Sequence, residues 1–270
     1  MSLYLPLFFP YLLVGSLIAQ ESQIQPIESE LAPPKVSIIA LGPKPARRYS
    51  VPQYKSSDPK TIGAQTILLE PPKTSTPPCQ LFYKRAGNRK WSRFNIRFNS
   101  QGALTTIPAL KPLSFYSNLS INENTKPYLK LPPLKFNTKT LIFLTPNEDK
   151  TPLWKDSPML TAIPLTRSVT GGSRVLLYNA SNQVVNLLFS DVTKIPLKPG
   201  SHKNIDLNEL ALTNKFTLKA KGLNDSKVAL QESMKNLPNR TKVYAFYDAD
   251  RRTNGGRTLG VFRATYEVPD

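Results

Sequence analysis

The sequence is poor in cysteine, histidine and glycine, and each shortage excludes a class of protein. The single cysteine, Cys79, cannot form an intramolecular disulfide, and we expect it to be a small residue in or beside a strand. The single histidine, His202, lies in the turn sequence "PGSHKN", and one histidine excludes zinc sites built from several histidines. The 12 glycines form neither a phosphate-binding loop nor a Gly-x-Ser-x-Gly nucleophile motif. The sequence therefore predicts no catalytic residue, no metal site and no cofactor.

Acidic residues are also scarce. Lys and Arg number 36 against 18 Asp and Glu, which gives a formal net charge of +18. The imbalance is greatest between Pro71 and Asn122, where no acidic residue occurs. Such a charge attracts anionic surfaces in general and indicates nothing about the fold. Sequence motifs typical of nucleic-acid-binding folds are absent, so the charge favours another anionic partner.

The N-terminus carries no charge over residues 2–19 and ends that run with small residues, including Ala19. This pattern predicts a signal peptide at residues 1–19 and an exported protein, periplasmic or extracellular. Pro6 and Pro10 interrupt the run, and no Lys or Arg precedes it. A retained membrane anchor is the alternative, because about 18 apolar residues approach the lower limit for a span. Membrane contact is expected only through this segment, if it is not cleaved.

Short strands dominate the rest of the chain. The stretch "KWSRFNIRF" places Phe94, Ile96 and Phe98 on one face and Trp91, Arg93 and Arg97 on the other, the period of a half-buried strand. "LSFYSNL" places Leu113, Phe115 and Leu119 on one side. Further strands are expected at "KVSIIALG", "TILLE", "TLIFLTP", "MLTAIPL", "RVLLYN", "QVVNLLFS", "TKIPL", "KFTLKAK", "TKVYAFYD" and "TLGVFRATYEV". "SKVALQESMKNLP" fits both a helix and a strand, and we favour the strand.

Two parts of the chain resemble each other. "FNSQGALTTIPALKP" and "FSDVTKIPLKP" share a pattern, each follows a tyrosine-containing strand ("LFYKR" and "LLYNA"), and each precedes an apolar strand with an acidic turn ("TLIFLTPNED" and "KVYAFYDAD"). Many short strands with turn signals favour sandwiches. The predicted fold is all-β: two tandem antiparallel immunoglobulin-like β-sandwich domains, at residues 35–157 and 158–270, after a linker at residues 20–34.

The run from "VLLYNAS" to "GSHKNI", together with the hairpin "VYAFYDADRR" and "TLGVFRATYE", is similar to a module of uncharacterised exported proteins from planctomycete and verrucomicrobial bacteria. The similarity covers mainly residues 158–270. It implies an exported β protein, and it implies no catalytic or binding residues.

The acid-free segment holds the candidate site. Basic residues cluster there around aromatic ones, and an aromatic ring beside guanidinium groups can stack on a sugar and bind an anion. The alternative is a solvated sheet face that discourages edge-to-edge aggregation. The predicted anion- or glycan-binding residues are Tyr83, Lys84, Arg85, Arg89, Lys90, Trp91, Arg93 and Arg97.

"YDADRRTNGG" is the most metal-like string. Asp248 and Asp250 match the first and third positions of a calcium loop, but Arg252 stands at the fifth, where an oxygen ligand is needed. We interpret the string as a hairpin loop in which Asn254 and Gly255 adopt positive φ and arginines pair with the carboxylates.

The sequence favours a non-enzymatic structural or interaction protein of the bacterial cell envelope. Its expected partner is an anionic envelope polymer or another envelope protein, and its oligomeric state stays open. The alternative is a carbohydrate-active enzyme or its accessory carbohydrate-binding domain, which would need carboxylates and aromatic residues in a concave site.

Overall fold

The computed structural model describes residues 31–50, 67–72, 74–85, 90–108, 111–122, 124–147, 153–166, 172–210, 215–237 and 239–268. By its internal contacts the chain divides into Met1–Leu31 and Ala32–Asp270, and the second unit holds the fold. The predicted signal peptide and the first part of the predicted linker lie outside the described residues.

The described residues form strands and one short 3₁₀ turn, η2 (Leu207–Leu210), which confirms the predicted β class. The strands are β1 (Lys35–Ala40), β2 (Arg48–Ser50), β3 (Ile67–Leu69), β4 (Gln80–Lys84), β5 (Trp91–Asn95), β6 (Arg97–Phe98), β7 (Thr105–Thr106), β8 (Leu113–Phe115), β9 (Leu129–Leu131), β10 (Lys139–Thr145), β11 (Met159–Pro164), β12 (Arg174–Asn179), β13 (Val185–Phe189), β14 (Thr193–Leu197), β15 (His202–Asp206), β16 (Lys215–Gly222), β17 (Leu230–Lys235), β18 (Arg240–Asp248) and β19 (Leu259–Glu267).

Two mixed sheets form the inner layers of this unit. The first inner sheet has the strand order β11-β10-β1-β6, with β7 also paired to β1, and the second has the order β15-β12-β18-β19. In the first sheet β1 and β10 run parallel, and in the second β12 and β18 run parallel. The prediction of purely antiparallel sheets is therefore wrong.

The physical reason is that the central strands are buried on both faces. Every residue of β10 after Lys139 is buried, and so is every residue of β12 after Arg174. Strands covered on both sides are apolar at nearly every position, as is typical of parallel pairs. Such a run can be recognised as a strand, but it carries no alternation that would indicate its neighbours.

An outer layer covers each inner sheet. Over the first, β4–β5 and β8–β9 meet at an isolated bridge, where Phe82 and Tyr116 exchange backbone hydrogen bonds of 2.8 and 2.9 Å. Over the second lies the antiparallel sheet β14-β13-β16-β17. Residues of these outer strands alternate between buried and more exposed, as in β16, because only one face meets a core.

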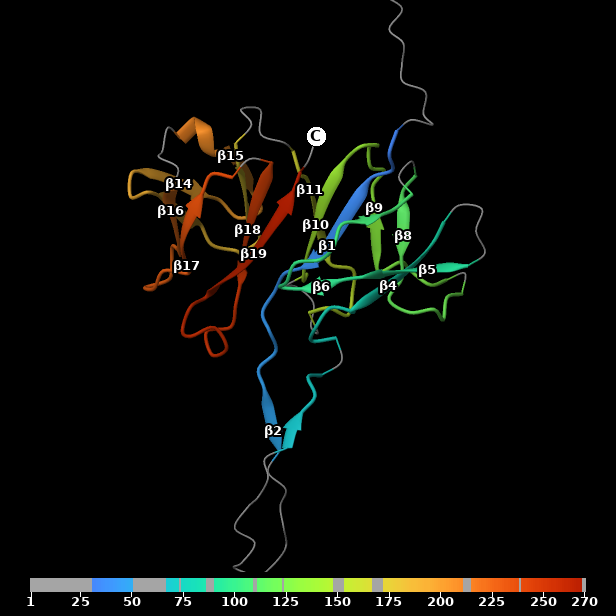
Figure 1. The fold of residues 1–270 in the computed structure, drawn as a ribbon. Coiled ribbons are helices and arrows are strands. Elements are labelled where there is room, and N and C mark those ends of the chain that lie inside the picture. The colour runs from blue at the N-terminus through green and yellow to red at the C-terminus, as the bar shows by residue number, and fades with distance from the viewer. Residues whose placement is uncertain are drawn as a thin grey trace, which may run out of the picture. The chain divides into compact units, whose positions relative to one another are not determined.

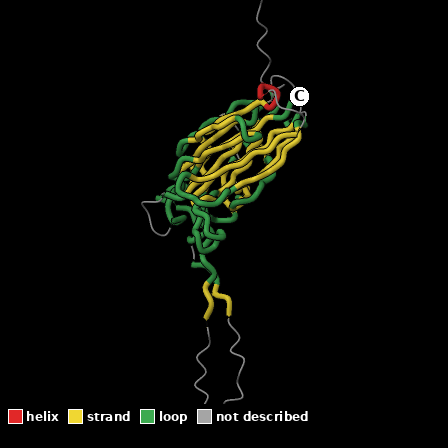
Figure 2. Tube along the Cα trace, turned by 90° about the vertical axis from the view of Figure 1, so that its left-hand side faces the viewer, coloured by secondary structure: helices red, strands yellow, loops and turns green. Residues whose placement is uncertain are grey.

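Three hydrophobic cores hold the layers together. One lies between the first inner sheet and its outer layer and contains Phe115, and another lies between the second inner sheet and its outer layer and contains Phe189. The third joins the two inner sheets and includes Phe143 of β10 and Phe262 of β19. In Figure 1 the layers follow one another from β14, β16 and β17 on the left to β4, β5, β8 and β9 on the right. Figure 2 shows the long strands side by side at a slant.

The two halves, residues 32–166 and residues 172–268, share one order of connections. Each begins with a central strand (β1 or β12), continues with an outer hairpin (β4–β5 or β13–β14), and returns beside the central strand (β7 or β15). An outer pair (β8–β9 or β16–β17) and a closing antiparallel pair (β10–β11 or β18–β19) complete each half. β10 begins at residue 139 and β18 at residue 240, an offset of 101.

This correspondence differs in detail from the sequence similarity. "TLIFLTPNED" and "KVYAFYDAD" do correspond, because they contain β10 and β18. "LFYKR" and "LLYNA" do not, because β4 belongs to an outer layer and β12 to an inner sheet. β11 follows residue 158 and pairs with β10, so the first half extends to at least Pro164. That each half is an independent domain stays a prediction.

The individual strand predictions are mostly confirmed. The ambiguous segment at residues 226–238 contains the strand β17, and His202 is exposed but begins β15 instead of lying in the turn. Leu119, expected to be buried beside Phe115, is 50% exposed beyond the end of β8. Cys79 is exposed immediately before β4.

One segment distinguishes the first half. Between β1 and β4, the strands β2 and β3 pair as a two-stranded ribbon that Figure 1 shows extending away from the sheets. Tyr49 and Leu68 on it are 55% and 57% exposed. The second half instead passes from β12 to β13 through residues 180–184, all of which are described. The ribbon is therefore an addition to the shared framework.

Candidate functional site

The hairpin β4–β5 presents one face on the outside of the first half. Its register places Phe82 opposite Arg93, and Lys84 opposite Trp91. The alternate residues of both strands, such as Leu81 and Phe94, line the core. Because side chains alternate along a strand, burying one set directs the other outward.

Aromatic rings and basic groups meet on this outer face. The Trp91 ring lies 5.6 Å from the Tyr116 ring, centroid to centroid, in an edge-on arrangement at 85°. The Lys84 Nζ lies 4.9 Å from the Trp91 ring centroid, within cation–π range. Phe82 lies between its two cross-strand neighbours, Arg93 and Tyr116. We call these five residues the aromatic–basic surface.

The charge of this surface is positive. Lys84 and Arg93 are exposed, and Arg85 and Lys90, at the ends of the hairpin strands, are exposed as well. No acidic residue occurs in the sequence from Pro71 to Asn122, which includes three of the four strands of this outer layer, β4, β5 and β8. Phe82, Trp91 and Tyr116 are each half-buried, so none of the three residues is fully covered.

The structure separates the predicted site residues into groups. Tyr83 is only 2% exposed and packs in the core with its ring 5.1 Å from that of Phe115. The prediction that Tyr83 belongs to a surface site is therefore wrong. Tyr83 is next to basic residues in the sequence, but side chains alternate along β4 and that of Tyr83 faces the core. Arg97 is exposed on β6, which pairs with β1 in the inner sheet instead of continuing the outer layer. Arg89 lies outside the described residues.

Sequence reasoning missed Phe82 and Tyr116. The alternation that assigns Trp91 and Arg93 to one face, applied to β4, would have placed Phe82 outward, since Leu81 and Tyr83 point inward. The alternation in "LSFYSNL" likewise places Tyr116 on the face opposite Leu113 and Phe115. The sequence gives no indication that Tyr116 lies beside Phe82, because the bridge joins segments more than thirty residues apart in the chain. Only the fold determines that pairing.

A pocket of about 480 Å³ lies where edge strand β9 approaches β11. Lys126, Lys130 and Ser157 contribute to its lining. Tyr128 also lines it, although the phenol oxygen is buried, and burial raises the pKa of Tyr128 well above its ordinary value. The pocket adds two more lysines to the basic character of the first half.

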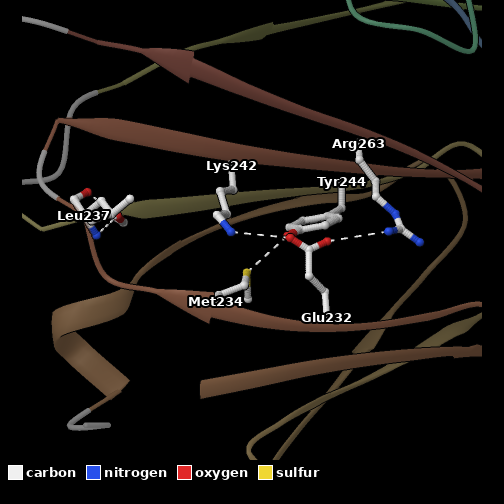
Figure 3. A network of polar contacts seen from close by, with 7 residues as sticks. Glu232, Met234, Leu237, Lys242, Tyr244 and Arg263 are labelled. Atoms are coloured by element: carbon white, nitrogen blue, oxygen red, sulfur yellow. Dashed lines mark hydrogen bonds and ion pairs between the residues drawn. The ribbon is translucent and has the colours of Figure 1, made fainter. Parts of the chain in front are cut away.

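The second half has a different polar cluster, shown in Figure 3. Glu232 on β17 lies between Lys242 on β18 and Arg263 on β19, with N–O distances of 3.4 and 3.8 Å. The Tyr244 hydroxyl donates a hydrogen bond of 3.1 Å to the Met234 sulfur. Burial, together with the Glu232 carboxylate, raises the pKa of Tyr244. This cluster joins the edge of the outer layer to the inner sheet, and its contacts are structural.

The loop between β18 and β19 is a hairpin, as expected. Gly255 and Gly256 have φ values of +61° and +82°, whereas Asn254, which was expected to share the positive φ, does not. The Asp250 carboxylate accepts a hydrogen bond of 2.8 Å from the backbone N–H of Arg252. Its role in the loop is therefore that of a local cap.

Among the described residues, no group of three or more His, Cys, Asp or Glu side chains comes together in a way that could hold a metal ion. No helix in the same residues has the length and apolar character needed to cross a membrane.

Comparisons with models of protein families and with characterised proteins found no match.

Proposed function

We propose that this chain is an exported, non-enzymatic interaction protein of the bacterial cell envelope that binds an acidic polysaccharide. The aromatic–basic surface carries this proposal. Its rings offer apolar faces on which a sugar can stack, and Lys84 and Arg93 flank them. A guanidinium group can contact carboxylate or sulfate through two parallel hydrogen bonds.

The acid-free sequence supports an anionic ligand over a neutral one. An anionic chain meets no repulsive carboxylate from Pro71 to Asn122, and the net charge of +18 attracts it from a distance. Export of the chain, if the N-terminal segment acts as a signal peptide, would place this surface among envelope polymers. The exported proteins that the sequence resembles fit the same setting.

The proposal includes the architecture. Each half has an inner sheet and an outer layer around its own core, and we propose that each acts as an immunoglobulin-like sandwich module whose outer layer carries the binding surface. Folds of this kind support many functions, so the function must be sought in the surface residues.

Retention on immobilised heparin tests the proposal. Arg93→Glu should elute at clearly lower salt than the wild type, because it reverses a charge beside the rings. Arg251→Glu is the matched control, since it makes the same charge change at an exposed position on the distant loop of the second half. Equal retention of Arg93→Glu and the wild type would contradict the proposal. Equal losses of retention in Arg93→Glu and Arg251→Glu would also contradict it, because they would indicate that net charge alone causes the binding.

Arg97→Glu refines the test. Four residues of extended chain span about 13 Å, and Arg97 belongs to the inner sheet. We therefore expect a smaller loss than for Arg93→Glu.

Trp91→Leu examines the stacking part of the proposal. It should weaken heparin binding without changing the charge, because a flat ring is lost. Binding of neutral dextran as tight as that of heparin would instead favour the carbohydrate-binding alternative, for which the partial exposure of Trp91 is the supporting observation.

A further inference from the structure

The outer face of the second half has a regular pattern of lysines and apolar side chains. On the sheet β14-β13-β16, Leu188 lies directly between Lys194 and Lys219. In the adjacent row, Asn186 lies directly between Pro196 and Lys221. Cross-strand neighbours on one face are close enough for their side chains to touch. Apolar groups are thus flanked by ammonium groups.

This face is hollowed. A groove of about 430 Å³ runs over the three strands, and its lining includes Leu188, Pro196 and Val228 together with Lys194, Lys219 and Lys221. Val228 is 42% exposed at its edge. Grooves of about 300–1,000 Å³ with mainly apolar walls and a few polar groups are typical of sites for small molecules. The floor is therefore suited to an alkyl chain.

Two of the three lysines that line the groove can offer their charge to an anion. Lys219 pairs with Asp191 at 2.8 Å. Within the described part of the chain, Lys194 and Lys221 have no acidic side chain in ion-pairing distance. Lysine stems can lie along an apolar surface while the ammonium groups stay in water. The rim therefore keeps a positive excess beside an apolar floor.

We propose that this groove binds a single-chain anionic amphiphile, with the alkyl chain on Leu188, Pro196 and Val228 and the anionic headgroup at Lys194 and Lys221. The positive charge of the lysines favours an anionic headgroup, and the apolar floor favours an alkyl chain. A polysaccharide would leave the floor unused. A bilayer surface would be met by a broad apolar or basic face, whereas the apolar area here is confined to a groove.

Calorimetric titration with monododecyl phosphate, below the concentration at which it forms micelles, tests the proposal. We expect saturable binding of one molecule per chain. Inorganic phosphate and dodecyl maltoside should each bind at least about tenfold more weakly, because each lacks one of the two contacts. Equal binding of inorganic phosphate or dodecyl maltoside, or no binding of monododecyl phosphate, would overturn the proposal.

Groove variants locate the site. Lys194→Gln/Lys221→Gln should weaken binding at least about tenfold through the headgroup, and Val228→Glu should do so through the chain. Both changes are at exposed positions, so the fold should persist. The matched control, Lys198→Gln/Lys203→Gln, removes two exposed charges of the same half outside the groove and should change affinity less than about twofold. Affinity unchanged in both groove variants would contradict the proposal.

Sedimentation with phosphatidylcholine–phosphatidylglycerol vesicles separates a bilayer from a single molecule. We expect the groove variants and the wild type to sediment equally. Vesicle binding that disappears in the groove variants, without binding of monododecyl phosphate, would show a membrane surface to be the ligand and overturn the proposal. This test is independent of the aromatic–basic surface, which lies in the first half.

Discussion

The two halves repeat one order of strands yet present different chemistry to solvent. The first half displays Trp91, Tyr116 and Arg93 on its outer layer, and the second displays Leu188 between two lysines. The buried frameworks correspond in their order of connections from β1 to β11 and from β12 to β19, and β2, β3 and β6 of the first half have no counterpart among the described strands of the second. The outer-facing positions can therefore vary while the connections stay constant, because only inward-facing positions build the cores.

The inner sheets and the outer layers also differ in what they contact. The inner sheets share a core between them, so each half contributes to the stability of the other. The outer layers have no such partner among the described residues. Changes at the shared core should therefore affect both halves, and changes on the outer faces only one.

The largest expected effect comes from Phe143→Ala in the shared core. Phe143 is fully buried, with its ring 5.0 Å from Tyr178 and 6.1 Å from Phe262. Removing a buried phenylalanine ring typically costs about 3–5 kcal/mol. Urea unfolding followed by tryptophan fluorescence reports the first half, which contains both Trp91 and Trp154, and circular dichroism reports both halves.

We expect Phe143→Ala to lower the midpoint of both signals together. Phe189→Ala is the comparison, because it creates a similar cavity in the core of the second half alone. Should Phe143→Ala shift only one of the two signals, the shared core would not couple the halves.

A second, smaller effect is expected at alkaline pH. Burial raises the pKa of Tyr178, Tyr244, Tyr247 and Tyr266 in the second half, and that of Tyr128 in the first. An unfolded tyrosine has a pKa of about 10. A raised folded-state pKa gives stability that is fully present below about pH 10 and is lost as pH rises from there through the folded-state pKa.

The free energy of unfolding should therefore fall as the pH rises above about 10, and the fall should be smaller in Tyr244→Phe. Tyr49→Phe, which removes a mostly exposed phenol on the ribbon, is the control. Identical pH profiles for Tyr244→Phe and the wild type would show that the phenol at the Glu232 cluster is not responsible. Urea titrations at each pH provide the measurement.

The sequence predicts the outer layers better than the inner ones. In "KWSRFNIRF" one side contacts the core and the other contacts water, so the alternation assigns Phe94 to the buried face and Arg93 to the exposed face. In "TLIFLTP" every residue is buried, so the hydrophobic pattern does not alternate. It therefore indicates neither the parallel pairing with β1 nor the contact of Phe143 with the other half. Burial on both faces removes the information that alternation carries.

The candidate site shows the same limit. The sequence predicts that Trp91 and Arg93 share a face, because they are two positions apart on one strand. It does not predict a surface position for Tyr83 once the alternation along its strand is applied, and Tyr83 is buried. Tyr116 could not be found, because its nearness to Trp91 depends on how two hairpins meet. Residues within one strand are predictable, whereas residues across a long-range bridge require the fold.

The smallest expected effect concerns Lys84 on the aromatic–basic surface. Lys84→Met keeps most of the aliphatic stem and removes the charge above the Trp91 ring, which lies 4.9 Å from Nζ. Exposed cation–π pairs contribute about 0.5–1 kcal/mol, so the unfolding midpoint should fall only slightly. A cycle with Trp91→Leu isolates the pair, because the Lys84→Met loss should disappear when the ring is absent. A loss as large as that of Phe143→Ala would mean that this face is part of the framework. A slight loss in stability combined with a clear loss in heparin retention would mark it as a surface kept for binding.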